Sequence, residues 1–271
     1  MGRRREAAGP AAALRAHWPE YLIEAWALGV FMISAGVFAT LLGYPGSPLL
    51  QFLPGAGLRR ALIGMAMGLT AIFLIYSPWG KRSGAHMNPA VTLTFLRLGK
   101  VGSWDAVFYI AAQFLGGTAG VLLAAAILRD RFTTAPVHYV ATLPGPPGPT
   151  VAFAAEFAIS TLLMSVILHV SNHPRLARFT GLCAGILVAT YITVEAPLSG
   201  MSMNPARSFA SAAPAGLWDS LWIYFTAPVL GMQAAAAWYA WRHGIQAVRC
   251  AKLLHPREQR CIHCGYTPGI T

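Results

Sequence analysis

One short sequence occurs twice in this chain, as Ser83-Gly84-Ala85-His86-Met87-Asn88-Pro89-Ala90 and as Ser199-Gly200-Met201-Ser202-Met203-Asn204-Pro205-Ala206. Both copies read Ser-Gly-x-x-Met-Asn-Pro-Ala, and their asparagines lie 204 − 88 = 116 positions apart. Asparagine is a favoured N-cap residue, and proline is favoured at the first position of a helix. Each copy therefore predicts a helix start. One copy alone would favour an ordinary loop, but two copies at matched places predict a functional site.

The composition is that of a polytopic membrane protein. The 271 residues are 56% hydrophobic and 11% charged, whereas a soluble domain carries about 25% charged residues. The net charge of +11 comes from residues in loops and tails between apolar stretches, which argues against a nucleic-acid-binding surface. No apolar stretch precedes Tyr21, so we expect the basic N-terminal segment not to be a signal peptide.

Six stretches are long and apolar enough, or nearly so, to cross a bilayer, which takes about 20 residues. They cover roughly 21–42, 60–78, 105–128, 151–170, 178–197 and 217–241. Two shorter apolar runs, 88–98 and 204–213, begin at the repeated motif. We therefore expect a first repeat over 20–128, a connecting loop over 129–150 and a second repeat over 151–242. Segments 1–19 and 243–271 flank the repeats.

The basic residues predict the orientation. Suppose that the chain starts in the cytoplasm and crosses six times. Four of the 20 Lys and Arg residues then face outward, namely Arg59, Arg60, Arg129 and Arg131. Arg207 belongs to the second motif, and the remaining 20 − 4 − 1 = 15 face the cytoplasm. Because cytoplasmic loops carry an excess of Lys and Arg, both ends are expected there.

The two halves also match outside the motif. A glutamate lies in the first stretch of each half, at Glu24 and Glu156. Pairs of small residues four apart recur at Gly64 and Gly68 against Gly181 and Gly185, and at Gly116 and Gly120 against Gly231 and Ala235. Such pairs let helices approach closely in lipid. Three crossings per half make the second half enter from the opposite side, which is an inverted repeat with its site at the midplane.

Inverted halves would bring the two helix starts together inside the membrane. Irregular backbone survives there only when it is buried or lines a water-filled cavity. We therefore expect carbonyl groups to line a cavity at Gly84, Ala85, His86, Gly200, Met201 and Ser202. Two helix N-termini carry positive partial charge and repel cations. The side-chain NH₂ groups of Asn88 and Asn204 would point to a neutral, hydrogen-bonding molecule between them.

On these residues, with Gln113 and Arg207-Ser208-Phe209, the chain resembles the aquaporin, or major intrinsic protein, family over roughly Trp18 to Trp241. The resemblance is to a bacterial-type water channel. It implies an all-α bundle of six transmembrane helices with two re-entrant half-helices at the motifs Asn88-Pro89-Ala90 and Asn204-Pro205-Ala206. It also implies a pore in each protomer, a homotetramer, a multi-pass protein of the plasma (inner) membrane, no enzymatic activity and no required cofactor.

The family's motif spacing places a selectivity filter at Met67, Ile192, Met201 and Arg207. The residue of the first half that corresponds to Arg207 is Val91. Because only the second motif, which enters from the outside, supplies a fixed positive charge, the constriction is expected in the outer half. An arginine beside a narrow pore adds an electrostatic barrier to protons and cations. Strict water channels of the family have a histidine where this chain has Ile192. An apolar ring with one arginine offers water fewer hydrogen bonds and tolerates larger neutral solutes.

Water with other small neutral solutes is therefore the expected cargo, with protons and ions excluded. Ser208 after the arginine, where glycerol channels have aspartate, favours water. Two alternatives remain: a glycerol, ammonia or hydrogen peroxide facilitator with little water specificity, and a secondary transporter. A transporter would need a coupling site, and the separated glutamates do not form one.

Three carboxylates in all lie in apolar sequence, at Glu24, Glu156 and Glu195. The resemblance implies that Glu24 and Glu156 accept hydrogen bonds from backbone N–H groups of the two loops. A proton relay is the rival interpretation. Glu195 is expected either to pair with Arg207 or to lie as a solvated charge in the outer vestibule.

The C-terminal segment holds Cys250, His255, Cys261, His263 and Cys264. The Cys-x-x-Cys spacing of Cys261 and Cys264 resembles a zinc knuckle, in which two thiolates sit on one tight turn. Cys250 with His255 or His263 would complete a Cys₃His site. Redox-active or inert thiols are the alternative.

Overall fold

The computed structural model describes residues 9–255 and 258–268. Parts of the expected flanking segments, residues 1–8, 256–257 and 269–271, lie outside the described residues. The described part is helical and contains no strand. Its helices are α1 (Pro10–Gly43), α2 (Leu49–Phe52), α3 (Ala56–Tyr76), α4 (Pro78–Ser83), α5 (Pro89–Arg97), α6 (Ser103–Leu128), α7 (Asp130–Thr133), η1 (His138–Val140), α8 (Pro149–Ser171), η2 (Ala177–Phe179), α9 (Thr180–Val194), α10 (Ala196–Ser199), α11 (Pro205–Ala215), α12 (Leu221–His243) and η3 (Ile245–Ala247).

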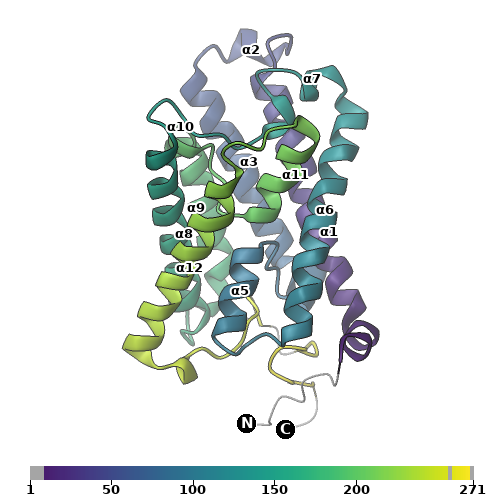
Figure 1. Ribbon diagram of the computed structural model, residues 1–271, viewed down its shortest axis with the longest axis vertical. Coiled ribbons are helices and arrows are strands. Elements are labelled where there is room, and N and C mark those ends of the chain that lie inside the picture. Colours follow the sequence, from purple (N-terminus) through teal and green to yellow (C-terminus); the bar gives the residue numbers. More distant parts are fainter. Residues whose placement is uncertain (1–8, 256–257, 269–271) are drawn as a thin grey trace.

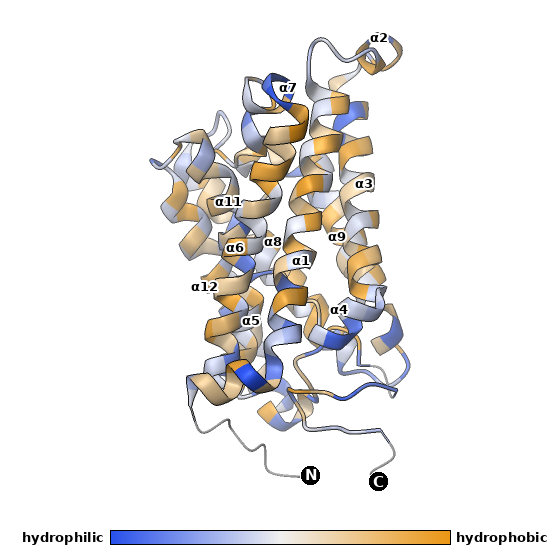
Figure 2. Ribbon diagram, turned by 90° about the vertical axis from the view of Figure 1, so that its right-hand side faces the viewer, coloured by the Kyte–Doolittle hydropathy of each residue, from blue (hydrophilic) through white to orange (hydrophobic). Residues whose placement is uncertain are grey.

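Six long helices, α1, α3, α6, α8, α9 and α12, form an elongated bundle (Figure 1). The prediction of an all-α membrane bundle is confirmed. Five of the six, all except α12, are long and apolar enough to cross a membrane, α9 together with η2. Helix α12 has 23 residues, but Gln233 and several tryptophan and tyrosine residues lower its hydropathy. It packs along α8 and completes the bundle. Hydrophobic residues continue along α1, α3 and α9 (Figure 2).

Two long elements differ from the predicted boundaries. Helix α1 begins at Pro10, not near residue 21, since Ala, Leu, Arg and Glu favour helix and proline fits the first helical position. The sequence predicts the fifth stretch over 178–197, but its helix, α9, ends at Val194. A separate short helix, α10, follows before the second motif.

The two half-helices, α5 and α11, lie between the long helices, one nearer each end (Figure 1). Both pack against α6 and α12, and they contact each other. Each half of the chain therefore contributes a long helix that supports the half-helix of the other. The segment that follows α12 lies at the same end of the bundle as α5 (Figure 1), and we call this end the tail end.

Small residues let the long helices approach closely. Helices pair as α1 with α6, α3 with α9 and α8 with α12. A Cβ added at Gly68 of α3 would lie 2.5 Å from the carbonyl oxygen of Gly185 in α9 and 2.9 Å from the Ala189 Cβ. The backbones thus touch where the predicted small-residue pairs meet.

Replacing Gly68 with leucine should force α3 and α9 apart, because the nearest obstacle is backbone and cannot rotate away. We expect a loss of about 1–3 kcal/mol in the free energy of unfolding. It is measured as a lower unfolding temperature of the purified protein. Leu58→Ala is the matched control, since Leu58 also lies in α3 and is 54% exposed. An unchanged unfolding temperature for Gly68→Leu would contradict this account of the helix pair.

Candidate functional site

The loops that carry the repeated motif have the same backbone in both halves. Gly84 and Gly200 have φ of 108° and 80°, in the left-handed region that favours glycine. Four non-glycine residues of these two loops also have positive φ, namely Ala85 (55°), Met87 (51°), Met201 (54°) and Met203 (54°). Such residues cost about 1–3 kcal/mol each and persist only where their surroundings hold them.

Two buried glutamates hold these loops. Glu24 accepts hydrogen bonds from the Ser83 hydroxyl (2.7 Å) and from the N–H groups of His86 (3.1 Å) and Met87 (2.6 Å). Gln113 also donates to Glu24, at 2.9 Å. Glu24 therefore anchors the first motif loop through one hydroxyl and two backbone N–H groups.

Glu156 has the corresponding contacts in the second half. It accepts from the Ser199 hydroxyl (2.7 Å) and from the N–H groups of Ser202 (2.6 Å) and Met203 (2.7 Å). The two loops are therefore fixed by the same set of one hydroxyl and two backbone amides.

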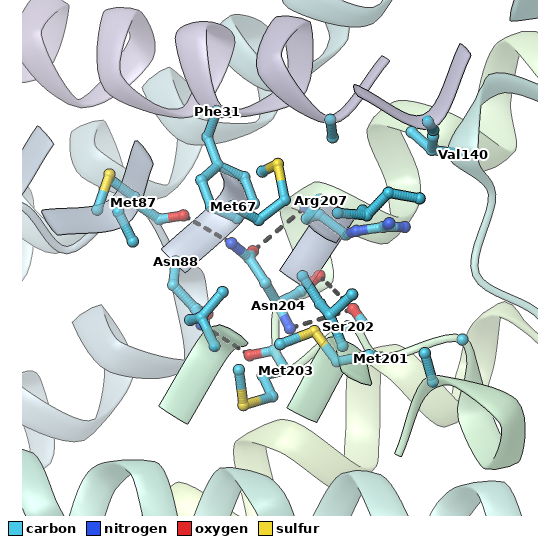
Figure 3. Close-up of a pocket in the computed structure, with 18 of the residues that line it drawn as sticks. Phe31, Met67, Met87, Asn88, Val140, Met201, Ser202, Met203, Asn204 and Arg207 are labelled. Atoms are coloured by element: carbon cyan, nitrogen blue, oxygen red, sulfur yellow. Dashed lines mark hydrogen bonds between the residues drawn. The ribbon is translucent and has the colours of Figure 1, made fainter. Parts of the chain in front are cut away.

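The two asparagines cap their own helices and bridge the loops. The side-chain oxygen of Asn88 accepts from Ala90 N at 2.8 Å, and that of Asn204 accepts from Ala206 N at 3.0 Å. Asn88 Nδ2 donates to the Met203 carbonyl, and Asn204 Nδ2 donates to the Met87 carbonyl, each at 2.7 Å (Figure 3). Because an amide NH₂ carries two hydrogens, each asparagine keeps a second N–H.

A cavity of about 710 Å³ runs past both asparagines. The predicted residues among its lining are Met67, Ala85, His86, Asn88, Ile192, Gly200, Met201, Ser202, Asn204 and Arg207. Figure 3 shows Met67 and Arg207 on the same side of Asn204. The remaining motif residues are packed behind the lining: Pro89, Ala90, Pro205 and Ala206 are buried.

The expectation that the Gly84 carbonyl lines the cavity is wrong. Gly84 is not among the lining residues. Its carbonyl oxygen accepts the N–H of Leu253, at 3.2 Å. The segment after α12 thus occupies a position that the sequence assigned to the cavity, and Leu253 itself lines it.

Arg207 supplies a positive charge beside the cavity. Its backbone N–H is capped by Asn204, and its buried Nη1 atom has no hydrogen-bond partner among the described residues. The predicted pairing with Glu195 is absent there: the ion pairs found join His17 to Asp105 and Arg82 to Glu20. Glu195 is also not the solvated charge of the alternative, because it is buried; in the described part of the chain neither of its carboxylate oxygens has a hydrogen-bond partner.

Sequence reasoning missed a pair of tyrosines that also hold the loops. Tyr109 in α6 donates to the Ser83 carbonyl at 2.7 Å, and Tyr224 in α12 donates to the Ser199 carbonyl at 2.6 Å. A signal was present, because each tyrosine lies seven residues before the first glycine of a small-residue pair (116 − 109 and 231 − 224).

The connecting loop was also missed as part of the site. The segment that follows α7, which lies at the end opposite the tail in Figure 1, contributes Pro136, Val137, Val140 and Ala141 to the cavity lining. At the tail end, His86 Nε2 donates to the Ala251 carbonyl at 2.9 Å, and its ring stacks on that of His263. Burial and the neighbouring His86 lower the pKa of His263 to about 3, so this imidazole is neutral at neutral pH.

Comparison with known proteins agrees with this geometry. Residues 15–239 match the family model described as "Major intrinsic protein". The chain is 38% identical over 176 residues to aquaporin NIP1-3 of Oryza sativa subsp. japonica, covering 64% of this chain and 59% of that protein. It is 36% identical over 208 residues to aquaporin NIP1-1 of the same species, covering 76% and 68%. The chain thus spans less than two thirds of the length of the first of these relatives.

A solved structure has the same fold. The aquaglyceroporin from Plasmodium falciparum superposes with a TM-score of 0.68 and 22% sequence identity, covering 82% of this chain and 95% of that one.

Proposed function

Because this chain belongs to the major intrinsic protein family, whose members are membrane channels and not enzymes, we propose that its cavity conducts water together with small neutral solutes. The observation that carries the proposal is that the cavity runs past Asn88 and Asn204 and that Arg207 lines it. Each asparagine keeps a second side-chain N–H besides the one that bridges the loops. A passing hydroxyl or water oxygen accepts a hydrogen bond from these groups.

Exclusion of cations follows from the same groups. Helices α5 and α11 start at Asn88 and Asn204, so two positive helix ends face the middle of the cavity. Arg207 adds a full positive charge. Cations meet repulsion along this path, while a neutral molecule meets the second N–H of each asparagine. The glutamates act in this scheme as loop anchors.

We assign the selectivity filter to Met67, Ile192, Met201 and Arg207, all of which line the cavity. Three apolar side chains and one guanidinium leave few hydrogen bonds for a water-only filter, and the methionines are flexible. Solutes such as glycerol or hydrogen peroxide therefore pass beside water. A facilitator with little water specificity is the alternative.

The same reasoning extends to assembly and orientation. We place the first repeat at 20–128, the second at 151–242, and both chain ends on the cytoplasmic side of the plasma (inner) membrane, on the excess of Lys and Arg there. An apolar groove between α1 and α3, lined by Val30, Phe38, Leu62, Leu69 and Phe73, faces outward and supports contact with lipid or a neighbouring protomer. A homotetramer is the expected assembly.

Stopped-flow light scattering on proteoliposomes tests the function. We expect fast osmotic shrinkage with weak temperature dependence, slower reswelling in glycerol and in hydrogen peroxide, and no proton leak. Protein-free liposomes of the same lipid are the control. Shrinkage no faster than in that control would contradict a water pathway, and uptake that requires an ion gradient would favour a transporter.

A further inference from the structure

The segment after α12 packs under the first motif loop. This tail consists of residues 245–255 and 258–268 in the described part. Val248, Ala251 and Leu253 are buried in the same apolar core as Ala85 and Phe95 of the first half. In Figure 1 the tail runs below α5, at the tail end of the bundle.

Polar contacts join the tail to the first motif loop and to helix α4 just before it. Leu253 N donates to the Gly84 carbonyl (3.2 Å), and His263 Nε2 donates to the Ser83 carbonyl (3.0 Å). Lys252 is only 2% exposed, and its ammonium group donates to the Lys81 carbonyl at 3.0 Å. Burying a lysine is costly unless its donors are satisfied. The buried Lys252 ammonium keeps this acceptor, the Lys81 carbonyl, only while the tail stays against the bundle, so the tail must be held in that position.

Four side chains of the tail gather at one point. The three thiols of Cys250, Cys261 and Cys264 and the His255 imidazole have ligand atoms that all lie within 4.8 Å of one another. Cys250 Sγ lies 3.5 Å from Cys261 Sγ, and His255 Nε2 lies 3.2 Å from Cys264 Sγ. In a tetrahedral zinc site with zinc–sulfur bonds of about 2.3 Å, two sulfurs lie about 3.8 Å apart. The cluster has nearly these dimensions.

The backbone between the cysteines forms a tight turn. Gly265 N donates to the Cys261 carbonyl at 3.0 Å, Cys261 N donates to the Tyr266 carbonyl at 2.8 Å, and Gly265 has φ of 76°. This turn places Cys261 and Cys264 on one side, as in a zinc knuckle. Cys250 and His255 approach from the segment of chain that precedes this turn.

The chemistry of the four donors selects the metal. Thiolate and imidazole ligands suit zinc, whereas calcium and magnesium require oxygen ligands. Four protein ligands without an open position are typical of structural zinc and not of catalytic zinc. Cys183, the remaining cysteine, lies in α9 and is not a member of the cluster.

We propose that Cys250, His255, Cys261 and Cys264 bind one zinc ion, and that this ion holds the tail against the Ser83–His86 backbone at the tail end of the cavity. The ion closes a loop of chain that carries Lys252 and Leu253. The site goes beyond the proposed transport function, because metal content and tail docking do not depend on what the cavity conducts.

Metal analysis of the purified full chain tests the site. We expect about one zinc per chain, since structural sites of this kind bind zinc tightly enough to survive purification. Cys250→Ser and Cys264→Ser should lose most of it, and Cys183→Ser, the matched control, should keep it. Absence of zinc from the wild type, or equal zinc in all variants, would overturn the proposal, as would an intact mass showing a Cys250–Cys261 disulfide.

Cobalt gives a readout on the wild type that needs no folded variant. After chelation and loading with Co²⁺ alone, the protein should show sulfur-to-cobalt charge-transfer absorption and the d–d bands of a tetrahedral site. An octahedral spectrum, or the same spectrum from a sample with alkylated thiols, would contradict a Cys₃His site.

Trypsin reports whether the ion holds the tail. Cleavage after the buried Lys252 requires the tail to open, so chelation should speed it by at least about tenfold, because proteolysis follows the population of the open form. Added Zn²⁺ should restore protection, and Mg²⁺ should not. A cleavage rate after Lys252 that is the same with and without zinc would show that the ion does not hold the tail.

Discussion

Replacing Arg207 with valine should let larger neutral solutes and protons through the channel. The substitution removes both the charge and the one polar side chain of the proposed filter, which consists of Met67, Ile192, Met201 and Arg207. We expect the ratio of glycerol to water permeability to rise by about tenfold or more, which corresponds to a barrier lower by about 1.4 kcal/mol. Stopped-flow reswelling and a pH-sensitive dye inside the liposomes measure the two effects.

The structure makes this variant interpretable. The buried Arg207 Nη1 has no protein partner among the described residues, so its removal leaves no protein acceptor unpaired there. Arg207→Lys is the control, since lysine keeps the charge but not the planar fork of donors. It should preserve proton exclusion and change solute preference. Wild-type solute ratios and no proton leak in Arg207→Val would remove Arg207 from the filter.

Replacing Glu156 with alanine should prevent the second half of the channel from folding. Three groups lose their acceptor at once, the Ser199 hydroxyl and the N–H groups of Ser202 and Met203. At about 1–3 kcal/mol for each unpaired buried donor, the loss is comparable with the whole stability of a protein, about 5–15 kcal/mol. We expect little monodisperse protein after size-exclusion chromatography and no osmotic permeability.

The chain offers a matched control for this variant in Glu195. It is also buried, but neither of its carboxylate oxygens has a hydrogen-bond partner among the described residues. Glu195→Gln removes a buried charge and keeps a side-chain oxygen as an acceptor, so the unfolding temperature should stay the same or rise. If Glu156→Ala gave wild-type yield and unfolding temperature, the anchoring role of the carboxylate would be wrong.

The parts of the site that sequence predicted are those fixed by local chemistry or by repetition. Asn88 and Asn204 are recognisable as helix caps because capping depends on neighbouring residues alone. Glu24 and Glu156 stand out because charge in an apolar stretch is rare and because each half has one. The all-α bundle follows from the lengths of the apolar stretches.

The parts that sequence missed depend on contacts across long separations. The Gly84 carbonyl was expected to face the cavity, but a backbone N–H from Leu253 reaches it. No periodicity marks Leu253 or Ala251 as partners of the first loop. Tyr109 and Tyr224 were missed for another reason: a tyrosine in an apolar helix is ordinary, and only its repetition at a fixed offset marks it. The grouping of Cys250 with His255 was anticipated by residue type alone.

The crossed hydrogen bonds of Asn88 to Met203 and of Asn204 to Met87 have a consequence for biosynthesis. A ribosome finishes α1 through α6 before it makes any residue of the second loop. Until then the Asn88 side chain lacks its acceptor, the Met203 carbonyl. The His86 ring likewise lacks its acceptor until the Ala251 carbonyl, 165 positions further on, has been made. The first half can therefore enter the membrane early, but its motif loop reaches its final hydrogen bonding only late in translation. Membrane insertion of the helices and completion of the pore are therefore separate steps in the synthesis of this chain.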